Sequence, residues 1–489
     1  LIMSLPLSDP QLLQSKAYIN GQWCDADDGA TLAVTNPATG EVIKEIAKLG
    51  ANETRRAIEA AETAMAEWQR QPAKARSQIL RRWFDLVMAN QEDLAIIMTA
   101  EQGKTLAESR GEVAYGASYI EWFSEQAKRI DGDVIPGPGS DRRIVCIKQP
   151  VGVCAAITPW NFPNAMITRK AAPALAAGCS VVIKPASETP LSALALAELA
   201  HRAGIPAGVL NVVAGSSGAI GGELTSNPTV RKLTFTGSTP VGKMLEAQCA
   251  ATLKKTSMEL GGNAPFIVFE DADIDAAVQG ALISKYRNSG QTCVCSNRLL
   301  VHESVADTFT AKLVEATRAF KLGNGAHDGV HLGPLVNQKA VADVDDLVQR
   351  TVADGGKVIL GGKPSDLGPC FYEPTIITGV TATMAVFRNE IFGPVAPITT
   401  FNTEEEAIAL ANDTEFGLAS YFYTRDIGRV WRVSEALEYG IVGVNEGVIS
   451  NEMAPFGGVK ESGSGREGSK YGIEDYLEIK YILMGGLDR

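Results

Sequence analysis

Long apolar runs are missing from this sequence of 489 residues. No stretch of about 18 uncharged apolar residues occurs, which argues against a transmembrane helix. The first residues, Leu1–Pro6, are apolar, but they lack a basic region and are soon followed by Asp9. We therefore expect no signal peptide, and these absences favour the cytoplasm as the location.

Histidine is also scarce, with four residues in the whole chain. None of them stands at zinc-finger spacing from a cysteine, so no metal site is indicated. A catalytic triad that depends on histidine is not expected either, because His201 ends an apolar segment and the others lie near polar loops. The eight cysteines are scattered along a long chain, which is not the pattern of a disulfide framework.

Positive charge is outnumbered, since 45 Lys and Arg stand against 57 Asp and Glu, for a net charge of -12. An acidic surface repels phosphate backbones, so nucleic-acid binding is not expected. Hydrophobic residues make up 45% and charged residues 21%, which is ordinary globular composition. A chain of this length should form two or three domains, and it contains no internal repeat.

Strand-like and helix-like segments alternate between Gly152 and Ala251, after a first stretch in which helical spacing of apolar residues dominates. The expected strands are Gly152–Ile157, Ser180–Lys184, Val209–Val213 and Lys232–Thr236. The expected helices are Asn164–Ala177, Leu191–Ala203, Gly218–Thr225 and Val241–Ala251. This alternation predicts parallel βαβ units with helices on both faces of a sheet, and ligands bind beyond the carboxyl ends of such strands.

A second α/β region is expected from near Gly261 to about Gly458. The tail that follows, Tyr471–Met484, contains alternating apolar and polar residues that predict a strand. This strand could pair with the one expected at Ile144–Ile147, or with a partner subunit.

Cys293 is the first candidate for chemistry. It follows the apolar helix expected at Ile274–Arg287, in a loop with a Gly-Gln turn. A thiolate is a strong nucleophile only if its pKa is lowered or a base is near. The alternative is a small buried apolar residue, which is the commonest fate of a free cysteine, and spacing alone leaves both open.

Two further residues could serve the same reaction. Glu259 ends a strand-like segment just before two glycines, and in a poorly solvated site its pKa would rise, which makes it a usable base near neutral pH. Asn161 lies between two prolines that fix the backbone, so its amide could donate to a developing oxyanion. The alternatives are a solvated glutamate at a strand end and an Asx turn.

Strand-to-helix turns of the first α/β region could bind a nucleotide. Lys184 is well placed at a strand end for ribose hydroxyls or phosphate, and the neutral Ser187 tolerates a 2′-phosphate that an acidic residue would repel. Gly237 and Ser238 begin a helix whose N-terminus favours a pyrophosphate, although the segment is not a G-x-G-x-x-G fingerprint. Gly215–Gly218 is a weaker candidate of the same kind, and ordinary turns are the alternative for all of them.

Together these motifs resemble the aldehyde dehydrogenase superfamily, in the family's order and approximate spacing, over nearly the whole chain from about Tyr18. The motifs that carry the resemblance are Met258–Asn263, Gly290–Cys293, Glu390–Pro394, Pro159–Pro163 and Pro455–Gly458. Within the superfamily the chain is most similar to the succinate-semialdehyde dehydrogenases, through Gly440–Asn445, Ile449–Glu452, Arg466–Gly472 and Cys293–Arg298. It differs at Asn288-Ser289, where a small residue is also usual, and at Arg388-Asn389, where the family often carries an acid.

The resemblance implies an α/β fold with a Rossmann-like cofactor domain, an α/β catalytic domain and a small β oligomerisation arm. The corresponding segments are 1–125 with 150–258, then 259–460, and finally 126–149 with 461–489. It also implies a homodimer or homotetramer.

The implied activity is NAD(P)-dependent oxidation of succinate semialdehyde to succinate, through a thiohemiacetal and a thioester on Cys293. Asn161 and the backbone N–H of Cys293 would hold the oxyanion, Glu259 would activate the hydrolytic water, and Lys170 would give electrostatic support. The residues expected at the cofactor are Trp160, Lys184, Ser187, Gly237, Ser238, Leu260, Glu390 and Phe392. Because Ser187 is neutral, we expect NADP to be accepted or preferred over NAD.

The distal carboxylate of this substrate calls for a cationic clamp, since arginine binds a carboxylate bidentately. Arg169 and Arg287, with Ser450 as a neutral donor, match the family's substrate positions, and an ordinary ion pair is the alternative for either arginine. Glutarate semialdehyde or another ω-carboxy aldehyde is the main alternative substrate, because one methylene is worth only about 1–3 kcal/mol.

Cys295 invites a hypothesis of redox control. A disulfide with Cys293 would need a strained turn, but it would remove the nucleophile. Two readings from other classes are a non-catalytic structural relative and a module that only binds NADP. The intact Cys293, Glu259 and Asn161 argue against both.

Overall fold

The computed structural model describes residues 2–489; Leu1, the first residue of the predicted cofactor-binding segment, lies outside them. The first half of the chain is built on an eight-stranded sheet in the order β19-β11-β10-β7-β8-β9-β1-β2. Its strands are β1 (Ala17–Ile19), β2 (Gln22–Cys24), β7 (Val153–Ile157), β8 (Val181–Lys184), β9 (Leu210–Val212), β10 (Val230–Thr236), β11 (Lys255–Glu259) and β19 (Gly463–Ser464). The five strands from β11 to β9 are parallel, as the alternation predicts.

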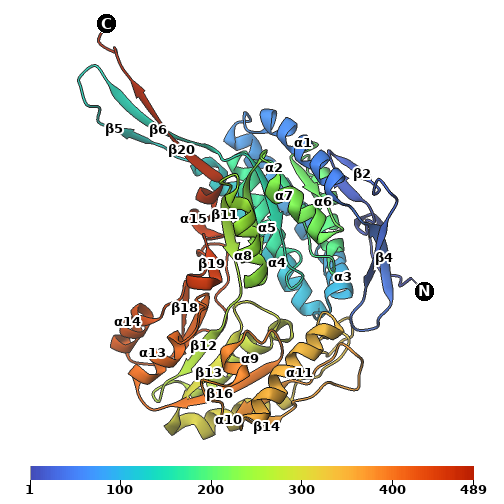
Figure 1. The fold of residues 1–489 in the computed structure, drawn as a ribbon, viewed down its shortest axis with the longest axis vertical. Coiled ribbons are helices and arrows are strands. Elements are labelled where there is room, and N and C mark those ends of the chain that lie inside the picture. Colours follow the sequence, from blue (N-terminus) through green and yellow to red (C-terminus); the bar gives the residue numbers. More distant parts are fainter. Residues whose placement is uncertain (1) are drawn as a thin grey trace.

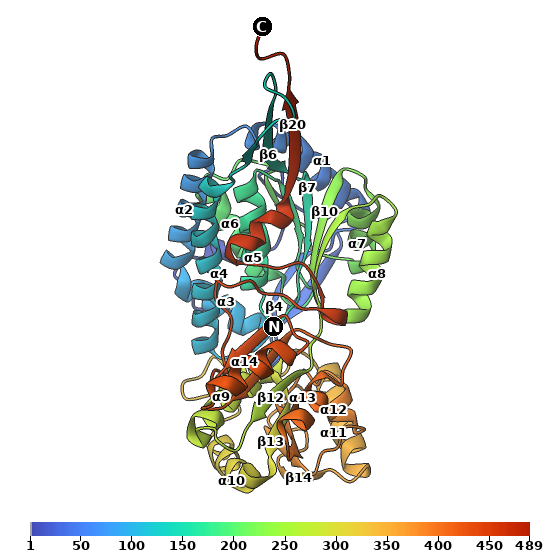
Figure 2. The same ribbon diagram turned by 90° about the vertical axis from the view of Figure 1, so that its left-hand side faces the viewer.

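Helices cover both faces of this sheet (Figure 2). They are α1 (Ala51–Trp68), α2 (Ala73–Ala89), α3 (Gln91–Gln102), α4 (Leu106–Gln126), α5 (Ala165–Ala177), α6 (Pro190–Arg202), α7 (Ser217–Ser226) and α8 (Thr239–Ala250). Every residue of β7 is buried, with Cys154 and Ala156 in one hydrophobic core and Val153, Ala155 and Ile157 in the other. A continuous apolar strand that contributes to two cores is typical of a parallel sheet covered on both sides.

A second sheet of seven strands lies below the first in Figure 1, in the order β14-β15-β16-β13-β12-β17-β18. Its strands are β12 (Ala264–Val268), β13 (Ser296–His302), β14 (Lys357–Leu360), β15 (Thr375–Thr378), β16 (Val395–Phe401), β17 (Ala419–Tyr423) and β18 (Ile441–Val444). Its helices are α9 (Ile274–Tyr286), α10 (Glu303–Arg318), α11 (Gln338–Ala353), α12 (Ala385–Arg388), α13 (Glu404–Asn412) and α14 (Ile427–Ala436). The chain passes from the first sheet to the second directly after Glu259, so this acid lies at the junction between them.

A three-stranded arm extends away from the first sheet (Figure 1). It consists of β5 (Asp133–Ile135), β6 (Arg143–Pro150) and β20 (Leu477–Met484), and β20 pairs antiparallel with β6 along its whole length. The first of the two pairings expected for the tail, with the strand around Ile144–Ile147, is therefore present. A separate two-stranded sheet, β3 (Thr31–Thr35) with β4 (Val42–Ala47), lies near the N-terminus.

The tail differs from its predicted form before β20. Residues 469–476 form α15 (Ser469–Gly472) and a 3₁₀ turn rather than strand, because Ile473 and Tyr476 bury their side chains in the core under α4 and α5. Of the segment 461–489 that was expected in the arm, β19 instead pairs with β11 in the first sheet. Among the described residues, no helix combines the length and apolar composition needed to cross a bilayer.

Candidate active site

The loop that carries Cys293 begins with a kinked turn at the end of α9. Asn288 and Ser289 have left-handed φ values of 52° and 56°, a conformation that costs roughly 1–2 kcal/mol per residue. Gly290 follows at φ 78°, and a Cβ there would lie 2.1 Å from the carbonyl oxygen of Gly393. Only glycine fits this close approach, and the turn delivers Cys293 half-buried between buried neighbours.

The thiol of Cys293 is protonated at neutral pH. Its pKa is raised to about 12, mainly by burial and also by the negative charges of Glu390 and Glu259, while the positive charge of Arg169 opposes them. Cys293 therefore has to lose its proton before or during attack.

Asn161 is held rigidly in the loop after β7. Its Oδ1 accepts from the backbone N–H of Phe162 at 3.1 Å, and its Nδ2 donates to the carbonyl of Gln291 at 3.2 Å, two residues before Cys293. An amide nitrogen carries two N–H groups, so the second remains for another acceptor. The backbone carbonyl of Asn161 accepts from Nδ2 of Asn288 at 2.9 Å, which ties this loop to the turn before Cys293.

Glu259 ends β11 with its carboxylate enclosed. It is 2% exposed, and neither oxygen has a hydrogen-bond partner among the described residues. A Cβ at Gly457 would lie 3.0 Å from Oε1, so the glycine leaves room beside it. Burial and the charge of Glu467 raise the pKa of Glu259 well above its usual value, opposed by Arg169 and Lys170. An enclosed carboxylate of raised pKa is a competent base near neutral pH.

Glu467 is a buried acid that the sequence did not reveal. Its Oε1 lies 2.7 Å from Nε of Arg169, and its Oε2 accepts from Nζ of Lys170 at 2.8 Å. Lys170 also donates to Oγ1 of Thr236 at 2.7 Å, so its charge is paired and two of its three donors are engaged. Lys170 and Glu467 are 297 residues apart, and only a lone acid within a glycine-rich run could have drawn attention to position 467.

A cavity of about 230 Å³ opens beside Cys293. Its wall contains Asn161 and six of the eight residues predicted at the cofactor. The lining residues are Pro159, Trp160, Asn161, Met166, Thr236, Gly237, Ser238, Leu260, Gly261, Cys293, Glu390 and Phe392. The cavity therefore lies at the carboxyl ends of β7, β10 and β11, where open α/β sheets bind ligands.

The phosphate-binding part of a dinucleotide fits the start of α8. Ser238 precedes this helix without a side-chain cap, which leaves backbone N–H groups for a phosphate. A Cβ at Gly237 would lie 2.4 Å from the ring of Phe235, so a larger residue would clash at this position. Glycine therefore leaves the start of α8 without a side chain of its own.

The opposite wall of the same cavity fits a nicotinamide and its ribose. The rings of Trp160 and Phe392 lie 5.5 Å apart and present apolar surface. Glu390 accepts the backbone N–H of Gly262 through Oε2, and burial raises its pKa to about 7. A carboxylate fixed in this way can accept hydrogen bonds from ribose hydroxyls.

Lys184 and Ser187 lie outside that lining, at the end of the neighbouring strand β8. Nζ of Lys184 donates to the carbonyl of Pro185 at 3.1 Å, and Oγ of Ser187 donates to that of Gly215 at 3.4 Å. Burial lowers the pKa of Lys184. Gly215–Gly218, the weaker candidate for a nucleotide-binding turn, thus adjoins Lys184 and Ser187. Together these residues form a polar edge that contains no buried acid.

A second cavity, of about 280 Å³, is lined by Phe162, the neighbour of Asn161. It brings Arg287 and Ser450 together, as the clamp hypothesis expects. The remaining lining residues are Lys104, Glu108, Gly111, Glu112, Tyr115 and Asn288.

Arg287 is the cation of this second cavity that has no ion-pair partner among residues 2–489, although the acid Glu108 also lies in the lining. Lys104 is paired with Glu112, and the carboxylate of Glu108 accepts from the backbone N–H groups of Thr105 and Asn288. Arg287 is half-buried, stacks 5.2 Å above the ring of Phe162, and forms no ion pair with any residue from 2 to 489. An anion that enters this cavity would find its strongest partner there.

Arg169 does not line that cavity. It is 1% exposed, pairs with Glu467 and lies 4.3 Å from the ring centroid of Phe456. The positive charge of Arg169 nevertheless acts on Cys293, which lines the first cavity, and on Tyr115, which lines the second. The structure thus separates the two predicted clamp residues, with Arg287 in the lining and Arg169 buried behind it.

Cys295 is buried, and its Sγ donates to the carbonyl of Gly290 at 3.4 Å. Nζ of the buried Lys285 approaches the same sulfur at 3.8 Å. Cys293 and Cys295 are both free thiols here, so redox control through them stays a prediction.

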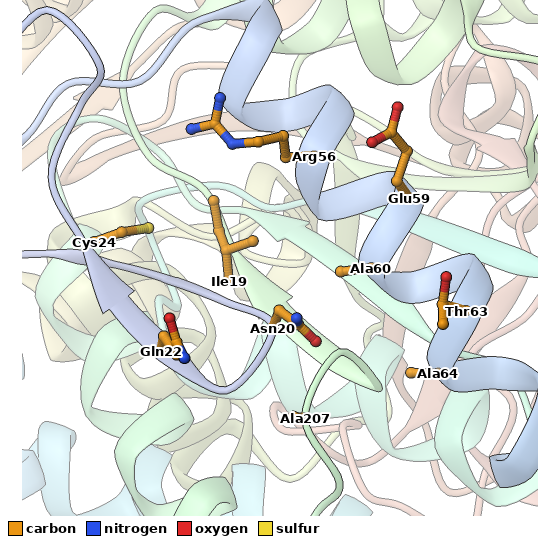
Figure 3. Close-up of a pocket in the computed structure, with 10 residues that line it drawn as sticks. All are labelled: Ile19, Asn20, Gln22, Cys24, Arg56, Glu59, Ala60, Thr63, Ala64 and Ala207. Atoms are coloured by element: carbon orange, nitrogen blue, oxygen red, sulfur yellow. The ribbon is translucent and has the colours of Figure 1, made fainter.

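A larger hollow, of about 510 Å³, lies at the opposite edge of the first sheet, between the β1–β2 hairpin and α1 (Figure 3). Its most basic group, Arg56, already pairs with Asp27 through two hydrogen bonds of 2.8 and 2.7 Å. Cys24, Asn20 and Glu59 also line the hollow, but Glu59 is exposed to solvent, unlike the buried Glu259. Within residues 2–489, no cluster of three or more His, Cys, Asp or Glu could hold a metal ion.

Comparison with known proteins agrees with this geometry. The model of the aldehyde dehydrogenase family matches residues 23–482. A glutarate-semialdehyde dehydrogenase of Pseudomonas aeruginosa is 63% identical over 483 residues, covering 99% of this chain and 100% of that protein. The NADP(+) succinate-semialdehyde dehydrogenase of Escherichia coli is 60% identical over 481 residues, covering 98% of this chain and 100% of the relative.

Solved structures give the same result. The crystal structure of a succinate-semialdehyde dehydrogenase from Burkholderia pseudomallei superimposes with a TM-score of 0.97 at 61% identity. The match covers 98% of this chain and 100% of that one. The α/β fold expected from the motifs is thereby confirmed.

Proposed function

The chain belongs to the aldehyde dehydrogenase family, and from that premise we propose that it oxidises succinate semialdehyde to succinate with NADP or NAD. Relatives that are 60% and 63% identical are named for succinate and glutarate semialdehyde, which share an aldehyde and a terminal carboxylate. The observation that carries the proposal is the unpaired charge of Arg287 in the 280 Å³ cavity. A guanidinium binds a carboxylate through two parallel hydrogen bonds, which neither an alcohol nor a methyl group can replace.

The first half of the proposed reaction takes place at Cys293. The thiol passes its proton to water as sulfur attacks the aldehyde carbon, the π electrons of the carbonyl move onto its oxygen, and the anion of a thiohemiacetal forms. The free N–H of the Asn161 amide and the backbone N–H of Cys293 hold the oxygen on which negative charge develops. Arg287 and Ser450 hold the distal carboxylate, so that the aldehyde end is oriented for attack.

The second half releases the product. When bound, NADP or NAD would supply a hydride acceptor beside the thiohemiacetal carbon, and oxidation of that carbon would leave a thioester on Cys293. Glu259 takes a proton from a water molecule, whose oxygen attacks the thioester carbon and frees the thiolate. Lys170, fixed by Glu467 and Thr236, contributes a positive charge that limits how far the pKa of Glu259 rises.

The cofactor is proposed to lie along the carboxyl ends of β8, β10 and β11. Trp160, Leu260, Glu390 and Phe392 would surround the nicotinamide end, and Gly237 with Ser238 the pyrophosphate. Lys184 and Ser187 would bind the other ribose; since Ser187 is neutral, a 2′-phosphate is not repelled. We therefore propose that NADP is used at least as well as NAD.

Steady-state kinetics on a chain-length series tests the substrate. We expect kcat/KM to be at least tenfold higher for succinate semialdehyde than for butanal, which has the same length without the carboxylate. For glutarate semialdehyde, the alternative substrate, kcat/KM should differ from the value for succinate semialdehyde by no more than the roughly 5- to 150-fold that about 1–3 kcal/mol per methylene allows. Equal values for butanal and succinate semialdehyde would refute the proposed substrate class.

The assembly and location are proposed as well. Val134, Ile479 and Tyr481 expose 81%, 71% and 61% of their surface on the arm, and apolar side chains exposed together are a mark of protein–protein contact sites. We propose that the arm, expected from 126–149 and 461–489 and formed by β5, β6 and β20, joins copies of the chain into a homodimer or homotetramer in the cytoplasm. The cofactor domain would comprise 1–125 with 150–258, and the catalytic domain 259–460. Light scattering that gives a monomer at micromolar concentration would contradict the assembly.

A further inference from the structure

A buried ion pair, Lys104–Glu112, lies behind the loop that carries Asn161. Each of the two side chains is 1% exposed. Nζ of Lys104 contacts Oε1 of Glu112 and donates to the backbone carbonyl of Asn161 at 2.8 Å. It also lies 4.0 Å from the ring centroid of Phe162. The ammonium group therefore holds the peptide that joins Asn161 to Phe162.

Glu112 connects the same ion pair to helix α5. Its Oε2 accepts the backbone N–H groups of Asn164 at 2.8 Å and Ala165 at 3.2 Å, at the start of that helix. A carboxylate at a helix N-terminus is stabilised by the helix dipole. The pair thus fixes both ends of the short segment from Asn161 to Ala165, through Lys104 in the turn between α3 and α4 and through Glu112 on α4.

The position of Lys104 in a cavity wall could also suggest contact with the substrate. Its donors are already engaged, however, with Glu112, with the carbonyl of Asn161 and with the face of Phe162. Burial lowers the pKa of Lys104, and the charge of Glu112 opposes this. The contacts leave Arg287, and not Lys104, to bind a carboxylate.

We propose that Lys104 and Glu112 are positioning residues for the oxyanion donor. They fix the orientation of the 161–162 peptide, and with it the direction in which the free N–H of the Asn161 amide points toward the oxygen that becomes negative on the carbon bound to Cys293. Asn288 holds the same carbonyl at 2.9 Å, so loss of Lys104 loosens the loop without releasing it completely. This inference rests on the oxyanion role proposed above for Asn161.

The first test compares Lys104→Met with a matched control, Lys254→Met. Lys254 is also buried and also donates to two backbone carbonyls, those of Asn227 and Val230, but it lies between β10 and α8 and lines neither cavity. A displacement of about 1 Å at a reacting group can cost on the order of 100-fold, so we expect Lys104→Met to lower kcat about 10- to 100-fold with KM within threefold. Lys254→Met should keep kcat even if its melting temperature falls as much.

A double-mutant cycle with Asn161→Ala separates positioning from general stability. Asn161→Ala alone should lower kcat about 10²–10³-fold, as loss of an oxyanion donor does, and in that background Lys104→Met should have no further effect. Alkylation of Cys293 by iodoacetamide, which forms no oxyanion, should proceed at the wild-type rate in Lys104→Met.

The outcomes are distinct. If Lys104→Met keeps full kcat, or lowers it equally with and without Asn161, the positioning role is wrong while the proposed function stands. If Asn161→Ala itself keeps full kcat, the proposed oxyanion role fails first. If Lys104→Met does not fold, Glu112→Gln takes its place, because the amide oxygen can still accept from α5 while the ion pair is lost. We expect Glu112→Gln to lower kcat about tenfold and to have no further effect in the Asn161→Ala background. An additive loss of kcat in that background would overturn the inference.

Discussion

Replacing Arg287 with alanine should convert an enzyme that selects carboxylate-bearing aldehydes into one that barely distinguishes them from neutral ones. In the lining of the 280 Å³ cavity, this guanidinium is the cation without an ion-pair partner among residues 2–489, since Lys104 is paired with Glu112. Arg169, which lies outside the lining, is paired with Glu467. No other cation in the lining can replace it without breaking an existing ion pair.

The size of the effect follows from the setting of Arg287. A hydrogen bond to a charged group contributes about 1.5–3 kcal/mol, and each 1.4 kcal/mol corresponds to about tenfold. Because Arg287 is half-buried rather than enclosed, water screens part of this energy, and we expect a loss nearer to tenfold than to 100-fold in kcat/KM. The distal carboxylate is bound alike before and during the reaction, so the loss should appear mainly in KM.

The assay measures kcat and KM for succinate semialdehyde and for butanal with wild type, Arg287→Ala and Arg287→Lys. Butanal should change less than threefold in both variants, which also controls for the lost contact of Arg287 with the ring of Phe162. Lysine keeps the charge without the planar fork and should fall between wild type and alanine. Equal losses for the two substrates in Arg287→Ala would refute the clamp.

Three further predictions concern single side chains. Glu259→Gln should lower steady-state kcat about 10²–10⁴-fold but leave a rapid first turnover, because the base is needed only for hydrolysis; absence of this burst would contradict that. Since burial raises the pKa of Glu259, its carboxylate becomes protonated as pH falls through a range above about 4.3. Wild-type kcat should therefore decrease with falling pH, and this pH dependence should flatten in Glu259→Gln. The same raised pKa means that ionising Glu259 costs folding free energy as pH rises, so Glu259→Gln should melt no lower than wild type at neutral pH, and a clearly lower melting temperature would count against it. Ser187→Glu should lower kcat/KM for NADP at least tenfold relative to NAD through like-charge repulsion, and an unchanged ratio would remove Ser187 from the cofactor site. Peroxide should inactivate the wild type, and dithiothreitol should restore its activity, whereas Cys295→Ala should not be inactivated in this way. An identical response of the variant would exclude Cys295 from redox control.

The fold was predictable where a short stretch of sequence determines its own environment. The apolar run Val153–Ile157 and the turns that follow each strand predict a parallel sheet with ligands at one edge, and the structure has this sheet. Asn161 follows strand β7 and Glu259 ends strand β11 of this sheet, so their position at one edge follows from topology. Cys293 precedes β13 of the second sheet, so its place beside them depends on how the two sheets pack, which no local pattern shows.

The long-range contacts behind the site could not be predicted in this way. Lys170 and Glu467, which form an ion pair, are 297 residues apart, and Lys104 and Asn161, which share a hydrogen bond, are 57 residues apart, so no periodicity or local motif links them. The same holds for Arg169, whose sequence position suits a substrate clamp while its side chain lies in a buried pair with Glu467. Pairing of buried charges depends on the packing of the finished fold, which a pattern of neighbours does not contain.

The most direct test of the account is intact-protein mass spectrometry of Glu259→Gln, quenched within one turnover after mixing with succinate semialdehyde and NADP. The account predicts a species heavier by one succinyl group, located on Cys293 by peptide mapping and absent from Cys293→Ser. An active enzyme without this adduct, or an adduct on another residue, would contradict the proposed thioester at Cys293.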